Sequence, residues 1–306
     1  MTDVVLNTIN LSKRYKGVNV VDQVNMTVKK GDIYGFIGLN GAGKSTFIRL
    51  ITGLTLPSQG GLDLFGQSDQ NGLINARKRM GMLIEHPAFF PHMTARENLE
   101  VIRMQRGIPG KECIQRTLDR VGLSHTGNKK VKSFSLGMKQ RLGIAIALLN
   151  DPEFLILDEP INGLDPMGVV EIRQLLKQLN EDYGTTILIS SHILSEVHQL
   201  ATHYGIIHHG KLIEQVSAAE LEQKSQAHLL IKVNDTGKAV AVLETVLGTT
   251  EFEVLPDGMI KLYSHLDDGP FISKTLMDHN LSIEQLTPQR DTLEGYFTRI
   301  IKEGSV

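Results

Sequence analysis

Residues 38–46 read Gly-Leu-Asn-Gly-Ala-Gly-Lys-Ser-Thr, a glycine-rich stretch that ends in lysine, serine and threonine. It satisfies the pattern G-x-x-x-x-G-K-[ST] through Gly38, Gly43, Lys44 and Ser45. Glycines let the backbone turn tightly, so its N–H groups can converge on a phosphate chain. In such a loop the lysine reaches the β- and γ-phosphates, and the serine hydroxyl ligates Mg²⁺. The stretch therefore predicts a site for the phosphates of a nucleotide.

The flanking sequence supplies the context that this loop requires. Residues 33–37 form a short apolar run typical of a buried strand, and residues 47–54 carry apolar side chains at helical spacing. A helix that begins near Gly43 directs its positive dipole end at the bound anion. The residues expected to contact ATP here are Gly38, Asn40, Gly41, Ala42, Gly43, Lys44, Ser45 and Thr46.

Two carboxylates follow a second apolar run. Residues 154–157 are all apolar and predict a fully buried strand, with Asp158 and Glu159 at its carboxyl end. Ligands of open α/β sheets bind at that edge. We expect Asp158 to hold Mg²⁺ through its water shell, together with Ser45. We expect Glu159 to orient and deprotonate the water that attacks the γ-phosphate.

One histidine occupies a corresponding position. Residues 185–190 predict another strand, and His192 follows it at the same edge of the sheet. A histidine there can donate a hydrogen bond to a γ-phosphate. The other histidines of this region, at 198, 203, 208 and 209, have no regular metal-ligand spacing and are interpreted as structural or surface residues.

The remaining segments of the first 215 residues predict two smaller layers. Residues 4–34 favour an antiparallel sheet, with Tyr15 in its first turn, where an aromatic ring could stack on adenine or pack against the protein. Residues 86–150 favour helices, including one that Ser135 is placed to cap. Thr94 and Glu97 have the spacing of a capping box.

Bulk composition limits the possible classes. The chain has 306 residues, 41% hydrophobic and 22% charged, which suits a globular protein with a sizeable core. A formal net charge of −2 argues against a nucleic-acid partner. The single cysteine, Cys113, excludes an internal disulfide. The start lacks the features of a signal peptide, and no apolar run approaches the ~20 residues of a membrane span, so we expect a cytoplasmic chain.

From about Ser217 the sequence changes character. Residues 227–306 hold 7 basic and 12 acidic side chains. They predict strands at 229–233 and 259–263 and helices at 239–247 and 271–279. Asp291 and Thr292 are expected to cap a last helix with one apolar stripe. We find no catalytic constellation in this part of the sequence, which suggests a role in regulation or dimerisation.

With these motifs in order, residues 3–215 resemble the ATP-binding subunit of an ABC transporter. The loop at 38–46 is similar to the Walker A motif of that family, and residues 154–159 to its Walker B motif with the catalytic glutamate. Residues 135–140 resemble the signature, 162–165 the D-loop with Asp165, and His192 the switch histidine. Tyr15 matches the aromatic residue that stacks on adenine.

Two positions depart from the usual family pattern. The signature L-S-G-G-Q is replaced by residues 134–138, Phe-Ser-Leu-Gly-Met, which keep Ser135 and Gly137 as γ-phosphate contacts and put Met138 in place of glutamine. Glu85 stands where the family usually has the glutamine of its Q-loop; it can still ligate Mg²⁺, although its charge repels the γ-phosphate. Both departures are similar to the subgroup that exports bacitracin-like and lantibiotic peptides.

The resemblance implies an architecture. It predicts an α/β P-loop NTPase core with an antiparallel β subdomain and a helical subdomain, followed by a small C-terminal α+β domain. The expected domains are 1–215, with the helical subdomain at about 86–150, and 216–306.

The resemblance also implies a mechanism. Two copies pair head to tail, with each ATP between Lys44 of one and Ser135 of the other. They drive a separate membrane permease, and the chain is held at the inner face of the membrane through it. The surface expected to face the permease is formed by residues 86–110, beside Glu85.

Three other functions remain open at this point. The first is a soluble ABC-type ATPase in DNA repair, cluster assembly or translation, although the long insertions or second cassette of some such proteins are missing. The second is a small P-loop kinase, which does not need residues 135–140. The third is a regulatory subunit that binds ATP without hydrolysis, against which Glu159 and His192 both weigh.

Overall fold

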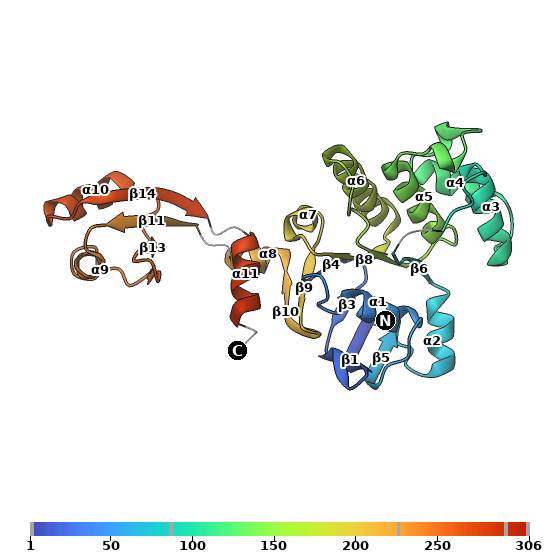
Figure 1. Cartoon of the computed structure of the whole chain (residues 1–306), viewed down its shortest axis with the longest axis horizontal. Helices are drawn as coiled ribbons and strands as arrows, with labels where there is room; N and C mark the ends of the chain where they lie inside the picture. The colour runs from blue at the N-terminus through green and yellow to red at the C-terminus, as the bar shows by residue number, and fades with distance from the viewer. Residues whose placement is uncertain (1–2, 86–87, 225–226, 291–292, 304–306) are drawn as a thin grey trace. The chain divides into compact units, whose positions relative to one another are not determined.

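The computed structural model describes residues 3–85, 88–224, 227–290 and 293–303. Their contacts divide the chain into two compact units (Figure 1). The first comprises Met1–Ala218 with Ile300–Val306, and the second comprises Ala219–Arg299. The boundary expected from the sequence, at 215/216, lies three residues before the division that these contacts give.

A six-stranded sheet forms the centre of the first unit. Its strand order is β10-β9-β4-β8-β7-β6, in which all neighbours are parallel except β10 and β9. The strands are β4 (Ile33–Ile37), β6 (Met80–Leu83), β7 (Phe154–Asp158), β8 (Thr186–Ser191), β9 (His203–His208) and β10 (Lys211–Ser217). Every residue of β4, β7 and β8 is buried, which explains their continuous apolar runs. The carboxyl ends of the parallel strands meet at one edge.

The first unit also contains a four-stranded antiparallel sheet. Its strands are β1 (Val4–Tyr15), β2 (Val18–Val24), β3 (Thr27–Lys29) and β5 (Gln59–Leu64), and β1 pairs with all three others. The predicted sheet is therefore present. The predicted position of Tyr15 in the turn was wrong. Tyr15 is the last residue of β1 and pairs with Val18, because the turn contains only Lys16 and Gly17.

Helices cover the sheets and form the predicted helical layer. In the first unit they are α1 (Lys44–Thr52), α2 (Gln70–Arg77), α3 (Ala95–Gln105), α4 (Glu112–Arg120), α5 (Leu136–Leu148), α6 (Pro166–Tyr183) and α7 (Leu194–His198). Thr94 and Glu97 form the predicted capping box of α3. Helices α3, α4 and α5 gather in one group (Figure 1), and α5 packs against β6.

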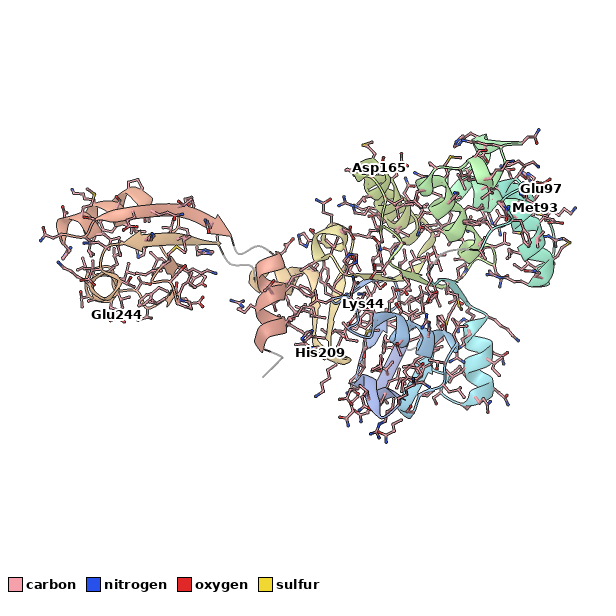
Figure 2. The ribbon with its side chains drawn as sticks, viewed as in Figure 1. Lys44, Met93, Glu97, Asp165, His209 and Glu244 are labelled. Carbon is pink, nitrogen blue, oxygen red and sulfur yellow. The ribbon has the colours of Figure 1, made fainter. Side chains whose placement is uncertain are left out.

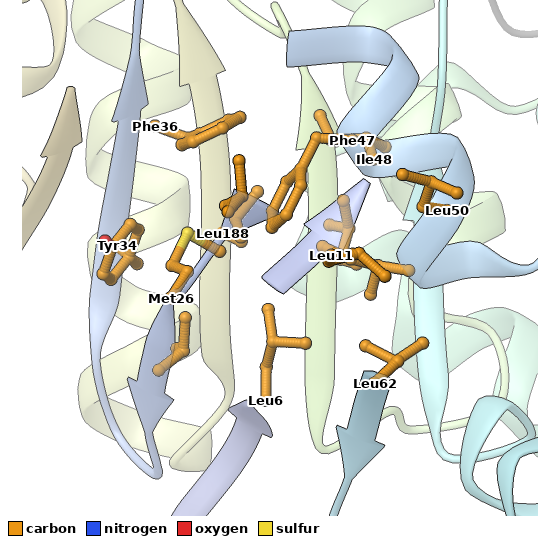
Figure 3. Packing of buried hydrophobic residues seen from close by; sticks show 14 of the residues in the cluster. Leu6, Leu11, Met26, Tyr34, Phe36, Phe47, Ile48, Leu50, Leu62 and Leu188 are labelled. Carbon is orange, nitrogen blue, oxygen red and sulfur yellow. The ribbon is translucent and has the colours of Figure 1, made fainter. Parts of the chain in front are cut away.

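The core of the first unit joins its two sheets through α1. Figure 3 shows Phe47 and Ile48 of α1 among side chains of both sheets, including Leu11 of β1 and Leu188 of β8. Phe36 of β4 and Phe47 have ring centroids 5.0 Å apart. Since these side chains are fully buried, α1 is fixed relative to β4, and so is the phosphate loop between them.

The second unit has its own core and topology. Its elements, in chain order, are β11 (Ala227–Val233), α9 (Thr236–Thr245), β12 (Phe252–Val254), β13 (Ile260–Leu262), α10 (Gly269–Asp278) and β14 (Ile283–Arg290). The sheet is antiparallel in the order β12-β13-β11-β14. This βαββαβ order is the ferredoxin-like arrangement. The helices α8 (Ala218–Lys224) and α11 (Leu293–Glu303) flank it in the sequence, and the proposed caps Asp291 and Thr292 lie outside the described residues.

Candidate nucleotide site

The phosphate loop connects β4 directly to α1. Gly43 has a φ of 108°, and a Cβ atom there would lie 2.6 Å from the carbonyl oxygen of Val20. A Cβ atom on Gly38 would lie 2.6 Å from the carbonyl oxygen of Ile207. Only glycine fits both positions, so these two residues of the motif are required by the packing around the loop as well as by its curvature.

The first turn of α1 faces into this loop. Its N-cap residue is Gly43, which supplies no side-chain acceptor for the first backbone N–H groups. Lys44 is buried, and its Nζ atom donates to the carbonyl oxygens of Gly38 at 2.7 Å and Leu39 at 3.3 Å. The loop therefore holds its lysine across its own opening, with backbone donors beside it, which is the arrangement that binds phosphate.

The two carboxylates after β7 are tied to the neighbouring strand by one hydroxyl group. Asp158 and Ser190 are paired positions of β7 and β8. The Ser190 Oγ atom donates to Asp158 Oδ1 at 2.5 Å and accepts from the backbone N–H of Glu159 at 2.9 Å. Glu159 has a φ of 47°, a left-handed conformation that costs of order 1 kcal/mol for a non-glycine residue. Such strain is concentrated at functional sites.

Lys44, Glu159 and His192 form one connected group. The Lys44 Nζ atom lies 3.2 Å from Glu159 Oε1, and His192 Nδ1 lies 2.9 Å from Glu159 Oε2. The amide of Asn162 also donates to Glu159 Oε2, at 3.3 Å. Three elements distant in the sequence therefore converge on this carboxylate, as the shared sheet edge predicted. Figure 2 labels Lys44 at the start of α1.

The residues expected to hold Mg²⁺ offer only oxygen atoms as metal ligands. Ser45 lies in the first turn of α1, and Asp158 is buried at the sheet edge. Hydroxyl and carboxylate oxygens suit Mg²⁺, which takes its remaining ligands from water and phosphate. The third expected ligand, Glu85, has a φ of 59° and is paired with Arg49 of α1. Within the described residues, no group of three or more His, Cys, Asp and Glu side chains is placed to bind a metal by itself.

Tyr15 presents an exposed ring near the end of α1. Its hydroxyl group lies 3.4 Å from the Thr55 hydroxyl, three residues beyond α1, and Lys13 Nζ lies 5.0 Å from its ring centroid. Tyr15 is 45% exposed, and the stacking of its ring on adenine stays a prediction.

The signature and D-loop residues lie at the starts of two other helices. Ser135 caps α5, as predicted, and its Oγ atom accepts from the backbone N–H of Met138 at 3.2 Å. Gly137 has open space where a Cβ atom would stand. Asp165 caps α6 through the backbone N–H of Gly168 (Figure 2). Within the described residues, no hydrogen bond or ion pair joins Ser135 or Asp165 to Lys44.

Sequence reasoning missed two contributors, Ser190 and Arg49. A polar residue at the carboxyl end of a buried strand was the available signal for Ser190.

Two of the other histidines contact the protein itself. His203 Nδ1 lies 3.2 Å from Asp32 Oδ1, and burial, with His209 nearby, lowers the pKa of His208.

Comparison with known proteins decides the family. The sequence pattern described as "ABC transporter" matches residues 21–162. The chain is 43% identical over 302 residues to the bacitracin transport ATP-binding protein BcrA of Bacillus licheniformis, and the match covers 99% of each chain. The chain belongs to the ABC transporter ATP-binding proteins. It is the ATP-binding subunit of such a transporter and an ATPase, as the motifs predicted.

Two further ABC proteins extend the comparison. The lantibiotic transport ATP-binding protein SrtF of Streptococcus pyogenes is 43% identical over 209 residues, covering 68% of this chain and 89% of SrtF. A dimer of the ATP-binding cassette MJ0796 with bound ADP and Pi has a TM-score of 0.62 and 25% identity, covering 70% of this chain and 98% of that chain. The P-loop NTPase core of this ABC protein is therefore confirmed. No helix in the described ranges is long and apolar enough to cross a membrane.

Proposed function

We propose that this ABC ATPase powers the export of bacitracin-like or lantibiotic peptides through a separate membrane permease. The supporting observation is the identity of 43% with a bacitracin transport ATP-binding protein along 99% of both chains. That match extends through residues 219–299, well beyond the shared ATP-binding core. The alignment with a lantibiotic transport protein covers 68% of the chain, which supports the broader peptide class.

The contacts of the site residues support a role for each of them. Lys44 would hold the β- and γ-phosphates, and Ser45, Asp158 and Glu85 would hold Mg²⁺, whose charge would offset that of the phosphates. Glu159 takes a proton from the water that attacks the γ-phosphate, and the bond to ADP breaks. His192 orients Glu159 through its Nδ1 atom, 2.9 Å away.

ATP lies between two copies of the chain in this proposal. Ser135 and Gly137 of one copy face the γ-phosphate held by Lys44 of the other, in an isologous pair. The exposed apolar side chains next to the motifs support such a surface: Leu39 in the phosphate loop, Leu136 in the signature, Met167 after Asp165 and Ile193 after His192. The MJ0796 cassette forms a dimer with ADP and Pi bound.

The permease docks on the helical layer. A groove of about 470 Å³ lies between α3 and α4, lined by apolar side chains that include Met93, Val101 and Ile114. Arg96 and Glu97 stand among its charged lining residues. Figure 2 marks Met93 and Glu97 at the start of α3. This groove belongs to the segment that follows Glu85, so a permease seated there contacts a region connected directly to the nucleotide site.

Peptide resistance tests this function. The gene is deleted in the organism that carries it, and the minimal inhibitory concentrations of bacitracin, a lantibiotic and an unrelated antibiotic are measured. We expect lower resistance to bacitracin or the lantibiotic alone, restored by the wild-type gene and not by Glu159→Gln. Unchanged resistance to both peptide classes would contradict the proposed substrate, while leaving the ATPase assignment intact.

A further inference from the structure

Arg49 and Glu85 form an ion pair at the carboxyl edge of the main sheet. The guanidinium Nη2 atom of Arg49 donates to Glu85 Oε1. Arg49 stands four residues after Ser45 on α1, and residues four apart share one face of a helix. Glu85 follows β6, whose last residue lies beside Leu157 of β7. The pair therefore lies one helical turn along α1 from the expected Mg²⁺ ligand Ser45.

The charge of Glu85 opposes nucleotide binding at this place. ATP is itself strongly anionic, and a like unit charge within about 8 Å near a protein surface changes a binding constant roughly threefold to thirtyfold. A guanidinium group in contact with the carboxylate holds it in place, and loss of that contact leaves the carboxylate free to approach the phosphates. Within the described part of the chain, Arg49 is the basic residue that pairs with Glu85.

We propose that Arg49 is a positioning residue that holds the Glu85 side chain in place beside the expected Mg²⁺ position, so that the carboxylate does not move toward the phosphates of bound ATP. This inference rests on the proposed place of Glu85 at the metal and nucleotide edge. The left-handed backbone of Glu85, with a φ of 59°, fixes the direction from which its side chain leaves the chain.

Because both side chains are exposed, an effect of Arg49 on ATP binding can be distinguished from an effect on folding. The Arg49 and Glu85 side chains are 42% and 61% exposed. Exposed ion pairs contribute little to folding, because solvent screens them and both side chains lose freedom. Truncation of Arg49 should therefore change ATP affinity while leaving the denaturation midpoint almost unchanged.

A double-mutant cycle on the purified full chain tests the proposal. The dissociation constant of a fluorescent ATP analogue is measured, with and without Mg²⁺, for wild type, Arg49→Ala, Glu85→Gln and the double variant. Arg49→Ala should weaken binding roughly threefold to tenfold when Glu85 is present. In the Glu85→Gln background no carboxylate remains to be held, so Arg49→Ala should weaken binding by a clearly smaller factor, which reports the loss of the Arg49 charge alone. Arg49→Lys should restore most of the affinity.

A matched ion pair at the other end of β6 supplies the control. Arg79 Nε lies 2.7 Å from Glu153 Oε1, at the opposite end of β6 and β7, and these side chains are 44% and 50% exposed. Arg79→Ala and Glu153→Gln should leave ATP affinity unchanged, alone and together. Although Arg79 also stacks on Phe65, that contact is part of the fold and lies outside the nucleotide site.

The binding measurements distinguish failure of the role of Arg49 from failure of the nucleotide site. Equal weakening by Arg49→Ala in both backgrounds, or no weakening beside Glu85, overturns the role of Arg49 while wild-type ATP binding stands. Absence of ATP binding by the wild-type chain contradicts the assignment of the nucleotide site, and with it this inference.

Discussion

The ammonium group of Lys44 lies 3.2 Å from the Glu159 carboxylate and 2.7 Å from the Gly38 carbonyl oxygen. Lys44 therefore links the phosphate loop to the residue proposed to activate water. Because His192 contacts the other oxygen of the same carboxylate, the site places a phosphate-binding cation and a hydrogen-bonding ring on opposite sides of Glu159. In the proposed function, Lys44 would hold the γ-phosphate and Glu159 would orient the attacking water beside it.

Removal of the Glu159 charge should separate binding from hydrolysis. Glu159→Gln keeps the size of the side chain but cannot accept the proton of the attacking water. We expect steady-state phosphate release to fall at least about 100-fold, with ATP affinity retained. Near-normal hydrolysis by this variant would remove Glu159 from its proposed role.

Loss of the His192 ring should act through Glu159. His192→Ala leaves the carboxylate without its contact at 2.9 Å, so we expect a lower kcat with little change in ATP affinity. His192→Gln, which can still donate, serves as the conservative variant and should recover part of the rate. If both variants retain the wild-type rate, His192 does not position the carboxylate.

The Ser190 hydroxyl group should matter for both stability and turnover. Ser190→Ala leaves Asp158 and the Glu159 N–H without their shared partner, and should lower the free energy of unfolding by about 1–3 kcal/mol, measured by urea denaturation. It should also lower the rate of phosphate release, because both carboxylates lose their orientation.

Thr186 at the other end of β8 is the control for Ser190. It is fully buried, and its hydroxyl accepts from the Gly31 N–H at 3.0 Å. Thr186→Val should lower stability by about 1–2 kcal/mol and leave the rate of hydrolysis unchanged. Equal rates for the two variants would limit Ser190 to a role in folding.

The groove between α3 and α4 should couple the ATPase to its permease. Val101→Glu introduces a charge among its apolar lining, so we expect loss of peptide resistance in cells while the isolated chain hydrolyses ATP normally. Ile74→Glu, at an exposed position on α2, is the surface control and should have no effect. Full resistance with Val101→Glu would place the docking surface elsewhere.

Local sequence patterns predicted the parts of the site that lie within single segments. The phosphate loop, the buried strand before Asp158 and the cap at Ser135 are each specified by fewer than about ten consecutive residues, so propensity and spacing suffice. The Arg49–Glu85 pair and the Ser190 bridge depend on which strands and helices are neighbours. That information is tertiary, and neither Arg49 nor Ser190 carries a motif of its own.

The second unit shows the same limit in its fold. Its strand β12 has only three residues; β13 is equally short, but it lies in the run 259–263, in which four of five residues are apolar. Strand β14 contains Pro288, and a proline in a sequence segment argues against its assignment as a central strand. The structure resolves this conflict because β14 is an edge strand. Both elements were therefore missed, although β11, β13, α9 and α10 were predicted.

A mixing experiment tests the shared ATP site most directly. Lys44→Ala and Ser135→Arg are each expected to abolish phosphate release as pure proteins. In a head-to-tail pair that combines them, one site contains both substitutions and the other contains neither. An equimolar mixture should regain up to about a quarter of the wild-type rate, since half of the dimers are mixed and each has one intact site of two. A mixture as inactive as its components, although dimers form, would contradict an ATP site built from Lys44 and Ser135 of different copies.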